Sequence, residues 1–359
     1  MSRRVAGVAG TLVLAGAMLG AQGPSGLVSS RPLEQYLEAL RRQAGIPGMS
    51  AAIVQEGQII WEHAFGFENQ EARIRATPDT PYPVGGLSQT LASVLLLQCV
   101  EQRRLELDGP VRTYGLALPE PNATLRHVLS HASADPPGAG YRLALDRYAQ
   151  LNAVMEWCAP QPYRKSAAHR LLERLAMKDS VPGADLADAS VVPDGLFDPA
   201  DLERYSQILQ RLAVPYKLDR KGRATRNDSV PREHLTAASG LVSTVRDLAQ
   251  FDAALDSGLL LLDETRSLAW SNTSGDNGVP LPTGLGWFVQ TYGGEPVVWQ
   301  YGQIDDAYGS LMIRLPARRT TFILLANSSA LNAPFELHQG DVTRSLFAML
   351  FLRLFMGAP

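Results

Sequence analysis

The sequence predicts an α+β protein in which one antiparallel sheet is built from both ends of the chain. Two strand-like segments follow a helical pattern near the start, and three strand-like segments precede another helical pattern near the end. The part between them reads as helices and long loops. With 359 residues, 45% of them hydrophobic, the chain can bury a sizeable core between such a sheet and the helices that cover its faces.

The predicted N-terminal elements are one helix and a pair of strands. Residues 31–43 carry apolar side chains at helical spacing, and a glycine and a proline follow and end the helix. Residues 49–54 and 58–65 flank the dipeptide Glu56-Gly57. The three segments together indicate a strand, a turn and a second strand.

The predicted C-terminal elements mirror this arrangement. Residues 297–302, 307–315 and 320–327 are expected to form three strands, the last two joined by a turn at 316–319. Residues 342–355 are expected to form a strongly apolar helix. At this length, its apolar character is more typical of a buried terminal helix than of a membrane contact.

The middle of the chain predicts a mainly helical insert at residues 75–279. The α/β sheet domain then consists of residues 30–74 and 280–359. Helical patterns in the insert cover residues 91–103, 125–130, 144–157, 167–176, 199–212 and 244–256.

The net charge of the chain and the spacing of its histidines give no sign of nucleic acid, an anionic membrane or a metal ion as a ligand. The formal net charge of −3 gives no reason to expect nucleic acid or an anionic membrane as a partner. Ser130 and His131 are adjacent and are not interpreted as a catalytic dyad, and the other five histidines lack the spacing of metal ligands. We therefore expect no metal and no other cofactor, and the sequence leaves the oligomeric state open.

The N-terminus predicts export. Arg3 and Arg4 precede an apolar segment, rich in Gly and Ala, that runs to Ala21. We expect residues 1–21 to be a signal peptide that directs the chain to the periplasm or the medium. An uncleaved membrane anchor is the alternative. Cys99 and Cys158 could form one disulfide in an oxidising compartment, but Cys99 lies among apolar residues, so a buried free thiol is equally open.

Several short motifs occur in a characteristic order: Gly45–Ala52, Asp79–Tyr82, Leu107–Val111, Leu125–His131, Ala238–Thr244 and Gly284–Trp287. Together they resemble the serine β-lactamase and penicillin-binding-protein superfamily, in particular its class C β-lactamase and family VIII esterase branch. The resemblance runs from Leu33 to Phe355. It implies a five-stranded antiparallel sheet flanked by N- and C-terminal helices, an inserted helical domain, and an active-site cleft between the two.

The first catalytic motif of active relatives is S-x-x-K at the start of a helix. Its serine is the nucleophile, and the lysine three residues later shares the same helix face and helps to remove the hydroxyl proton. In the matching stretch, Gly86 stands at the serine position and Gln89 at the lysine position. None of the four lysines of the chain has a serine three residues before it.

The second and third motifs are also altered. The resemblance places Leu143 where relatives carry the proton-shuttling tyrosine of Y-x-N, although a two-residue slip would give that role to Tyr141. The third motif is K-T-G in β-lactamases and often H-x-G or W-x-G in other relatives. Here Gln300 replaces the lysine or histidine, and Gly302 keeps the close backbone approach.

The motifs together predict a catalytically inactive member of the family. Ser88 is the nearest alternative nucleophile, but it lies about 200° around the helix axis from Gly86. The alternative hypothesis is an active serine hydrolase, an esterase, β-lactamase or D-Ala-D-Ala peptidase, that uses another nucleophile.

The cleft is expected to remain concave without its nucleophile and to bind a small molecule, such as a peptidoglycan fragment or an ester, without turnover. The residues expected to line it are Gly86, Ser88, Gln89, Tyr141, Leu143, Trp299, Gln300, Tyr301, Gly302 and Asn332.

Overall fold

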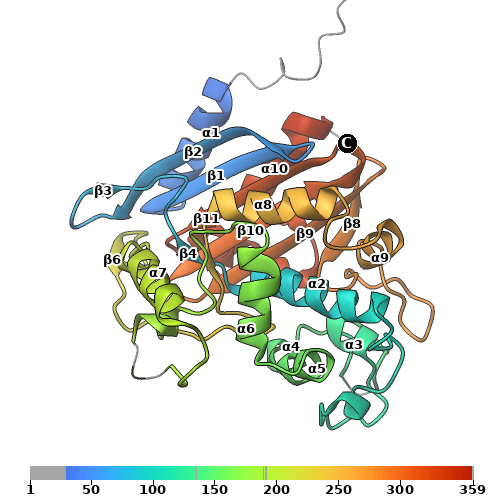
Figure 1. The fold of residues 1–359 in the computed structure, drawn as a ribbon. Helices are drawn as coiled ribbons and strands as arrows, with labels where there is room; N and C mark the ends of the chain where they lie inside the picture. Colours follow the sequence, from blue (N-terminus) through green and yellow to red (C-terminus); the bar gives the residue numbers. More distant parts are fainter. Residues whose placement is uncertain (1–29, 135, 189, 191, 358–359) are drawn as a thin grey trace, which may run out of the picture.

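A computed structural model of the protein describes residues 30–357, apart from 135, 189 and 191 (Figure 1). The predicted signal peptide therefore lies outside the described residues. None of the helices in the described part is long and apolar enough to cross a membrane.

The centre of the protein is a seven-stranded antiparallel sheet with the strand order β3-β2-β1-β11-β10-β9-β8. The predicted α+β fold is confirmed, although the expected sheet had five strands. The two additional strands, β3 and β8, are short and lie at the two edges, where fewer residues produce a recognisable period. The strands are β1 (Gly48–Gln55), β2 (Gln58–Asn69), β3 (Ile74–Arg75), β8 (Phe288–Tyr292), β9 (Glu295–Ile304), β10 (Tyr308–Leu315) and β11 (Thr320–Ala326).

The two ends of the chain meet in the pair β1–β11, where Met49 lies opposite Ala326. Successive side chains of a strand point to opposite faces of a sheet. Accordingly, Met49, Ala51 and Ile53 of β1 belong to one hydrophobic core, and Ala52 belongs to the other. Both faces of the central strands are therefore covered.

Helices cover these two faces in separate layers (Figure 1). Helices α1 (Ser30–Gln43) and α10 (Leu346–Met356) share one core with the sheet. Helix α8 (Val245–Asp256) packs against β1 and β11 on the other face, where α2 (Ser88–Glu101) joins the same core. Thus α8, which lies in the range predicted as the insert, packs directly on the sheet.

Capping residues and turns divide two helices that the sequence predicts as continuous. At the C-terminal end, a 3₁₀ turn at Val342–Arg344 precedes α10, because Ser345 is extended and its hydroxyl caps the new helix by accepting a hydrogen bond from the Ala348 N–H. The predicted helix at 144–157 is likewise two helices that meet at Gln150.

The other helices of the middle of the chain are separated by turns and loops. They are α3 (Leu125–Leu129), α4 (Leu145–Ala149), α5 (Leu151–Cys158), α6 (Tyr163–Ala167), α7 (Pro199–Gln210) and α9 (Asp263–Ala269). A π-helical segment, Ala168–Glu173, continues α6, and the last three residues of the predicted helix at 167–176 form a turn instead. Two small pairs, β4 (Tyr82–Pro83) with β7 (Val242–Ser243) and β5 (Tyr216–Leu218) with β6 (Ala224–Arg226), were not predicted.

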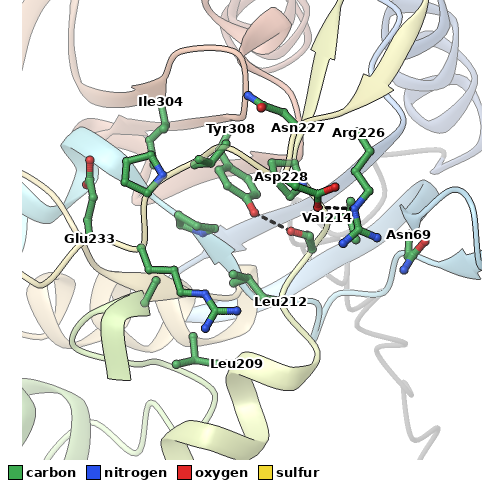
Figure 2. A pocket seen from close by; sticks show the side chains of 18 of the residues that line it. Asn69, Leu209, Leu212, Val214, Arg226, Asn227, Asp228, Glu233, Ile304 and Tyr308 are labelled. Carbon is green, nitrogen blue, oxygen red and sulfur yellow. Dashed lines mark hydrogen bonds and ion pairs between the residues drawn. The ribbon is translucent and has the colours of Figure 1, made fainter. Parts of the chain in front are cut away.

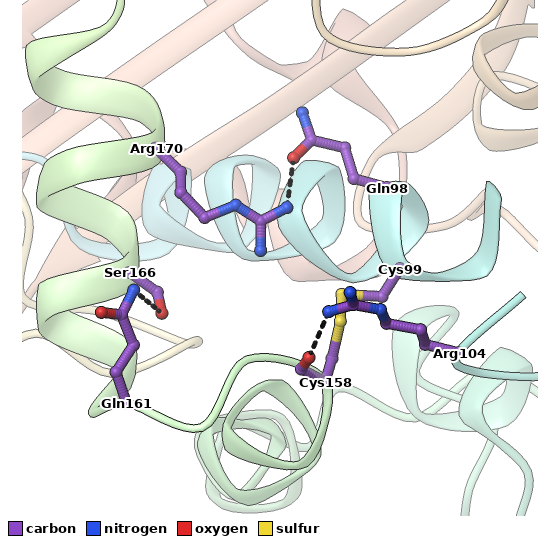
Figure 3. Close-up of a disulfide and its surroundings, with 7 residues drawn as sticks. All are labelled: Gln98, Cys99, Arg104, Cys158, Gln161, Ser166 and Arg170. Carbon is purple, nitrogen blue, oxygen red and sulfur yellow. Dashed lines mark hydrogen bonds between the residues drawn. A yellow bond between two sulfur atoms is a disulfide. The ribbon is translucent and has the colours of Figure 1, made fainter. Parts of the chain in front are cut away.

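Cys99 of α2 and Cys158 of α5 form a disulfide (Figure 3). Their Cα atoms are 6.2 Å apart, and both residues are buried. Arg104 donates a hydrogen bond of 2.9 Å to the carbonyl of Cys158 beside the bond. Of the two alternatives that the sequence left open, the structure has the disulfide, which ties the helix that begins at the first motif to α5.

Candidate functional site

The four altered motif positions, Gly86, Gln89, Leu143 and Gln300, line one cavity of about 390 Å³. We call it the motif pocket. Its walls come from four separate segments of the chain, which the fold brings together between the start of α2, the loop before α4, the end of β9 and the region after β11. The other lining residues are Leu145, Tyr301, Gln303, Asp305, Ala333, Glu336, Leu337 and His338.

The chain is packed tightly where relatives carry the serine nucleophile. A 3₁₀ turn at Gly85–Leu87 leads into α2 and lies against β9. A Cβ atom added at Gly86 would lie 2.5 Å from the carbonyl oxygen of Tyr301, which is backbone and cannot rotate away. A Cβ atom added at Gly302 would lie even closer to the carbonyl oxygen of Val84. Neither glycine therefore has room for a side chain.

Gln89 is held by a buried histidine. Nδ1 of His131 lies 3.3 Å from the N–H of Ala144, which can only donate, so Nδ1 accepts and Nε2 carries the proton. Nε2 then donates to Oε1 of Gln89 over 2.9 Å. This leaves the amino group of Gln89 directed toward Gly86, 3.5 Å from the place of its absent Cβ.

His131 is uncharged in this arrangement. It is 3% exposed, and burial lowers its pKa to about 4. The lysine position therefore holds a neutral amide, which is no base. The imidazole bonded to it has its one unprotonated nitrogen, Nδ1, engaged by the Ala144 N–H and a pKa far below 7, so it is a poor proton acceptor as well. The sequence placed His131 in a structural motif, and nothing in its spacing indicated a contact with a residue 42 positions earlier.

Both polar groups of the Gln300 side chain form hydrogen bonds with the backbone. Its amino group donates to the carbonyl of Gly286 over 3.2 Å, and its Oε1 accepts from the N–H of Tyr301 over 2.9 Å. The side chain is 3% exposed and carries no charge. Gln300 thus lines the motif pocket but does not replace the cation of the family motif.

Tyr301 has the only side-chain hydroxyl among the described residues that line the motif pocket. Burial of the phenol, together with the negative charge of Asp305, raises its pKa to about 12. Tyr301 is therefore a protonated phenol near neutral pH, able to donate a hydrogen bond to a ligand.

Two predicted cleft residues point elsewhere. The hydroxyl of Tyr141 donates to the carbonyl of His338 over 2.8 Å, and its ring packs edge-on against His131 and Phe288. Leu143, not Tyr141, lines the motif pocket. Ser88 is fully buried, and its hydroxyl accepts from the N–H of Leu241 over 3.2 Å, which fits its place on the opposite side of the helix from Gly86.

Trp299 lies outside the motif pocket. It is 1% exposed and stacks on Phe288 in the core under α1 and α10, which covers it on that face of β9. Asn332 does not line the motif pocket either, but its amino group donates to the carbonyls of Gly302 and Ser310 and thereby joins β9 to β10.

A second cavity, of about 360 Å³, also reaches the β9–β10 turn and is shown in Figure 2. Ile304 lines it, whereas Gln303 and Asp305 line the motif pocket. Tyr308 donates to the Ala213 carbonyl over 2.7 Å in this second cavity, beside an ion pair of Arg226 with Asp228. None of the altered motif positions contributes to it, so the motif pocket is the candidate functional site.

Comparison with known proteins identifies the family of the chain. The family model described as Beta-lactamase matches residues 33–342. A D-aminopeptidase of Brucella canis is 22% identical over 300 residues, which are 76% of this chain and 55% of that protein. The chain thus spans about half the length of the curated relatives it matches.

Solved structures show the same fold. The octameric penicillin-binding protein homologue from Pyrococcus abyssi superposes with a TM-score of 0.73 at 21% identity, over 92% of this chain and 78% of that one. The D-amino acid amidase from Ochrobactrum anthropi SV3 gives a TM-score of 0.68 at 18% identity, over 90% and 98% of the two chains. The family model covers most of the chain, and the protein belongs to the β-lactamase family of serine hydrolase-like proteins.

Proposed function

We propose that this protein is an exported, catalytically inactive member of the β-lactamase family whose motif pocket binds a small ligand without hydrolysing it. The observation that carries the proposal is that Gly86, Gln89, Leu143 and Gln300 line one cavity. The resemblance places the catalytic groups of active relatives at these positions. In this chain none of the four residues supplies a nucleophile or a group that transfers a proton.

Acyl transfer requires a nucleophile and a base within hydrogen-bond reach of it. Gly86 has no side chain, and the amide of Gln89 is bonded to a neutral imidazole. In serine hydrolases, loss of the nucleophile alone lowers kcat by about 10⁶-fold. Further losses at Leu143 and Gln300 add little once the nucleophile is gone.

An active hydrolase with another nucleophile is the competing hypothesis. Tyr301 supplies the one hydroxyl of the described pocket walls and is the first candidate for another nucleophile. With a pKa of about 12, however, only about one molecule in 10⁵ carries the phenolate at pH 7. Ser88 is buried and faces Leu241. Both facts favour the inactive protein.

A ligand with amide or ester groups fits the walls of the motif pocket. The amino group of Gln89 and the hydroxyl of Tyr301 are donors for a ligand carbonyl, and the leucines Leu143, Leu145 and Leu337 offer apolar contact. The relatives include a D-aminopeptidase, a D-amino acid amidase and a penicillin-binding protein homologue. These names support a small peptide, amide or ester of the cell-wall type as the ligand.

The disulfide supports export. Disulfides persist in oxidising compartments such as the periplasm, and Cys99 and Cys158 form one. The signal-like segment at residues 1–21 supports the same location. Fractionation of the native cells, with an intact mass of the mature protein, tests this part of the proposal.

The test of inactivity is hydrolysis of p-nitrophenyl acetate and of D-phenylalanine amide. We expect the rates of the wild type and of Tyr301→Phe to be equal and close to the uncatalysed rate. Tyr36→Phe is the matched control, because Tyr36 is an exposed tyrosine outside the motif pocket. A rate well above background that Tyr301→Phe abolishes and Tyr36→Phe keeps would overturn the proposal.

A further inference from the structure

We infer that the motif pocket selects ligands that carry an ammonium group and disfavours ligands that carry a carboxylate. This inference rests on the proposed binding function and names the class of ligand. The observation behind it is the charge of the cavity. Among the described residues that line it, Asp305 and Glu336 are carboxylates, and there is no lysine or arginine.

The cation that the motif pocket lacks belongs to the third family motif. Gln300 stands where the resemblance to the family expects a lysine or histidine, and its amide is bonded to backbone groups. A positive charge there would attract a ligand carboxylate, and its absence leaves the two carboxylates of the walls to set the potential. Relative to the pattern of the relatives with K-T-G, the sign of the charge in the pocket is reversed.

Asp305 and Glu336 are both exposed to solvent, and Asp305 contributes more to this potential because it is not ion-paired among the described residues. It lies in the β9–β10 turn, and its Oδ1 accepts from the side-chain amide of Gln303 over 2.7 Å. An amide does not neutralise a carboxylate, and the described part of the chain places no cationic side chain within ion-pair distance of Asp305. Its charge also contributes to the raised pKa of Tyr301, so the field reaches the hydroxyl inside the motif pocket.

Glu336 contributes less. It forms an ion pair with Arg344, which partly neutralises it, and its side chain is 51% exposed. Solvent screens an exposed pair of this kind strongly. His338 and Tyr301 are the remaining ionisable groups of the walls.

The test uses three blocked D-amino acids that share one backbone: N-acetyl-D-lysine amide, N-acetyl-D-glutamine amide and N-acetyl-D-glutamic acid amide. At about pH 8 their side chains are positive, neutral and negative. Calorimetric or ligand-observed NMR titration at low ionic strength should give the tightest binding to the lysine derivative. The glutamine derivative should bind about fivefold more tightly than the isosteric glutamic acid derivative, the scale of one partly exposed charge interaction.

Asp305→Asn should reduce both differences severalfold, and Glu336→Gln should reduce them less. Asp306→Asn is the matched control: Asp306 is the exposed neighbour outside the motif pocket, and asparagine tolerates its positive φ of 57°. We expect this control to keep the wild-type order. Independently of any variant, added salt should weaken binding of the lysine derivative and strengthen binding of the glutamic acid derivative.

The outcomes distinguish failure of the charge inference from failure of the proposed binding function. Equal affinity for the three ligands, or preference for the carboxylate, would overturn the charge inference and leave a binding pocket in place. No binding of any of the three would overturn the inference and count against the proposed binding function as well.

Discussion

Oε1 of Gln89 accepts a hydrogen bond from Nε2 of His131 over 2.9 Å, and this contact joins the start of α2 to the loop after α3. The resemblance to the family aligns Gln89 with the catalytic lysine. On that alignment, an amide fixed by a buried, neutral ring takes the place of an amine poised for proton transfer. The replacement has measurable consequences for stability as well as for catalysis.

The first prediction concerns the pH dependence of stability. Burial lowers the pKa of His131 from 6.5 to about 4, so the unfolded chain binds a proton at a higher pH than the folded chain does. The free energy of unfolding should therefore fall as the pH decreases from about 6.5 to 4, by about 3 kcal/mol for a shift of this size. Urea unfolding at a series of pH values measures it.

His131→Asn isolates this contribution, because asparagine tolerates the positive φ of 53° at this position. The variant should be less stable near pH 7 and should lack the loss between pH 6.5 and 4. Asp247, whose pKa burial raises to about 6, acts with the opposite sign, but it does so equally in both proteins. His234→Asn, at an exposed histidine, should keep the wild-type slope. An unchanged slope in His131→Asn would contradict the account.

The second prediction concerns the closed nucleophile position. Gly86→Ala places a Cβ 2.5 Å from the Tyr301 carbonyl, and overpacking of this kind costs about 1–3 kcal/mol. Gly140→Ala is the control, because a Cβ there has nothing within 4 Å and needs no positive φ. Thermal melting should show a loss for Gly86→Ala alone. Equal melting temperatures would mean that the turn before α2 moves freely away from β9.

The same contact bears on restoring activity. A variant with Gly86→Ser, Gln89→Lys, Leu143→Tyr and Gln300→His carries the nucleophile and the proton-transfer groups of the family, but its serine requires β9 and the Gly85–Leu87 turn to separate. We expect this variant to melt at a lower temperature than the wild type and to hydrolyse p-nitrophenyl esters only weakly. Efficient hydrolysis by a fully stable variant would show that the two backbones separate easily.

The third prediction concerns the disulfide. Cys99 and Cys158 are 59 residues apart, and closing a loop of this length stabilises a folded protein by roughly 2–4 kcal/mol. The double variant Cys99→Ser with Cys158→Ser should unfold at a lower denaturant concentration than the wild type. Reductant should destabilise the wild type and leave the double variant unchanged. A wild type that is insensitive to reductant would contradict the disulfide.

Much of the fold could be predicted because its central strands are long and periodic. The segments 49–54, 297–302, 307–315 and 320–327 alternate or run apolar over enough residues to identify β1, β9, β10 and β11. The edge strand β3 has two residues and leaves no period. The break between α4 and α5 was missed because Gln150 is itself compatible with a helix, so no residue type indicates the interruption.

The motif pocket was partly predictable, for a different reason. Family motifs single out Gly86, Gln89, Leu143 and Gln300, and these four residues line one cavity. The walls at Asp305 and at Glu336–His338 carry no motif and follow only from the three-dimensional arrangement. The motif around Gln300 does not show that Trp299 is covered by the core under α1 and α10.

The central claim, that the cleft has no nucleophile, is tested most directly by intact-protein mass spectrometry. The protein is incubated with a fluorophosphonate and, separately, with a penicillin, both of which acylate or phosphonylate an active serine. The account predicts that the mass stays that of the unmodified protein in both cases. A stoichiometric adduct with either reagent would contradict it, and peptide mapping would then identify the residue that carries the label.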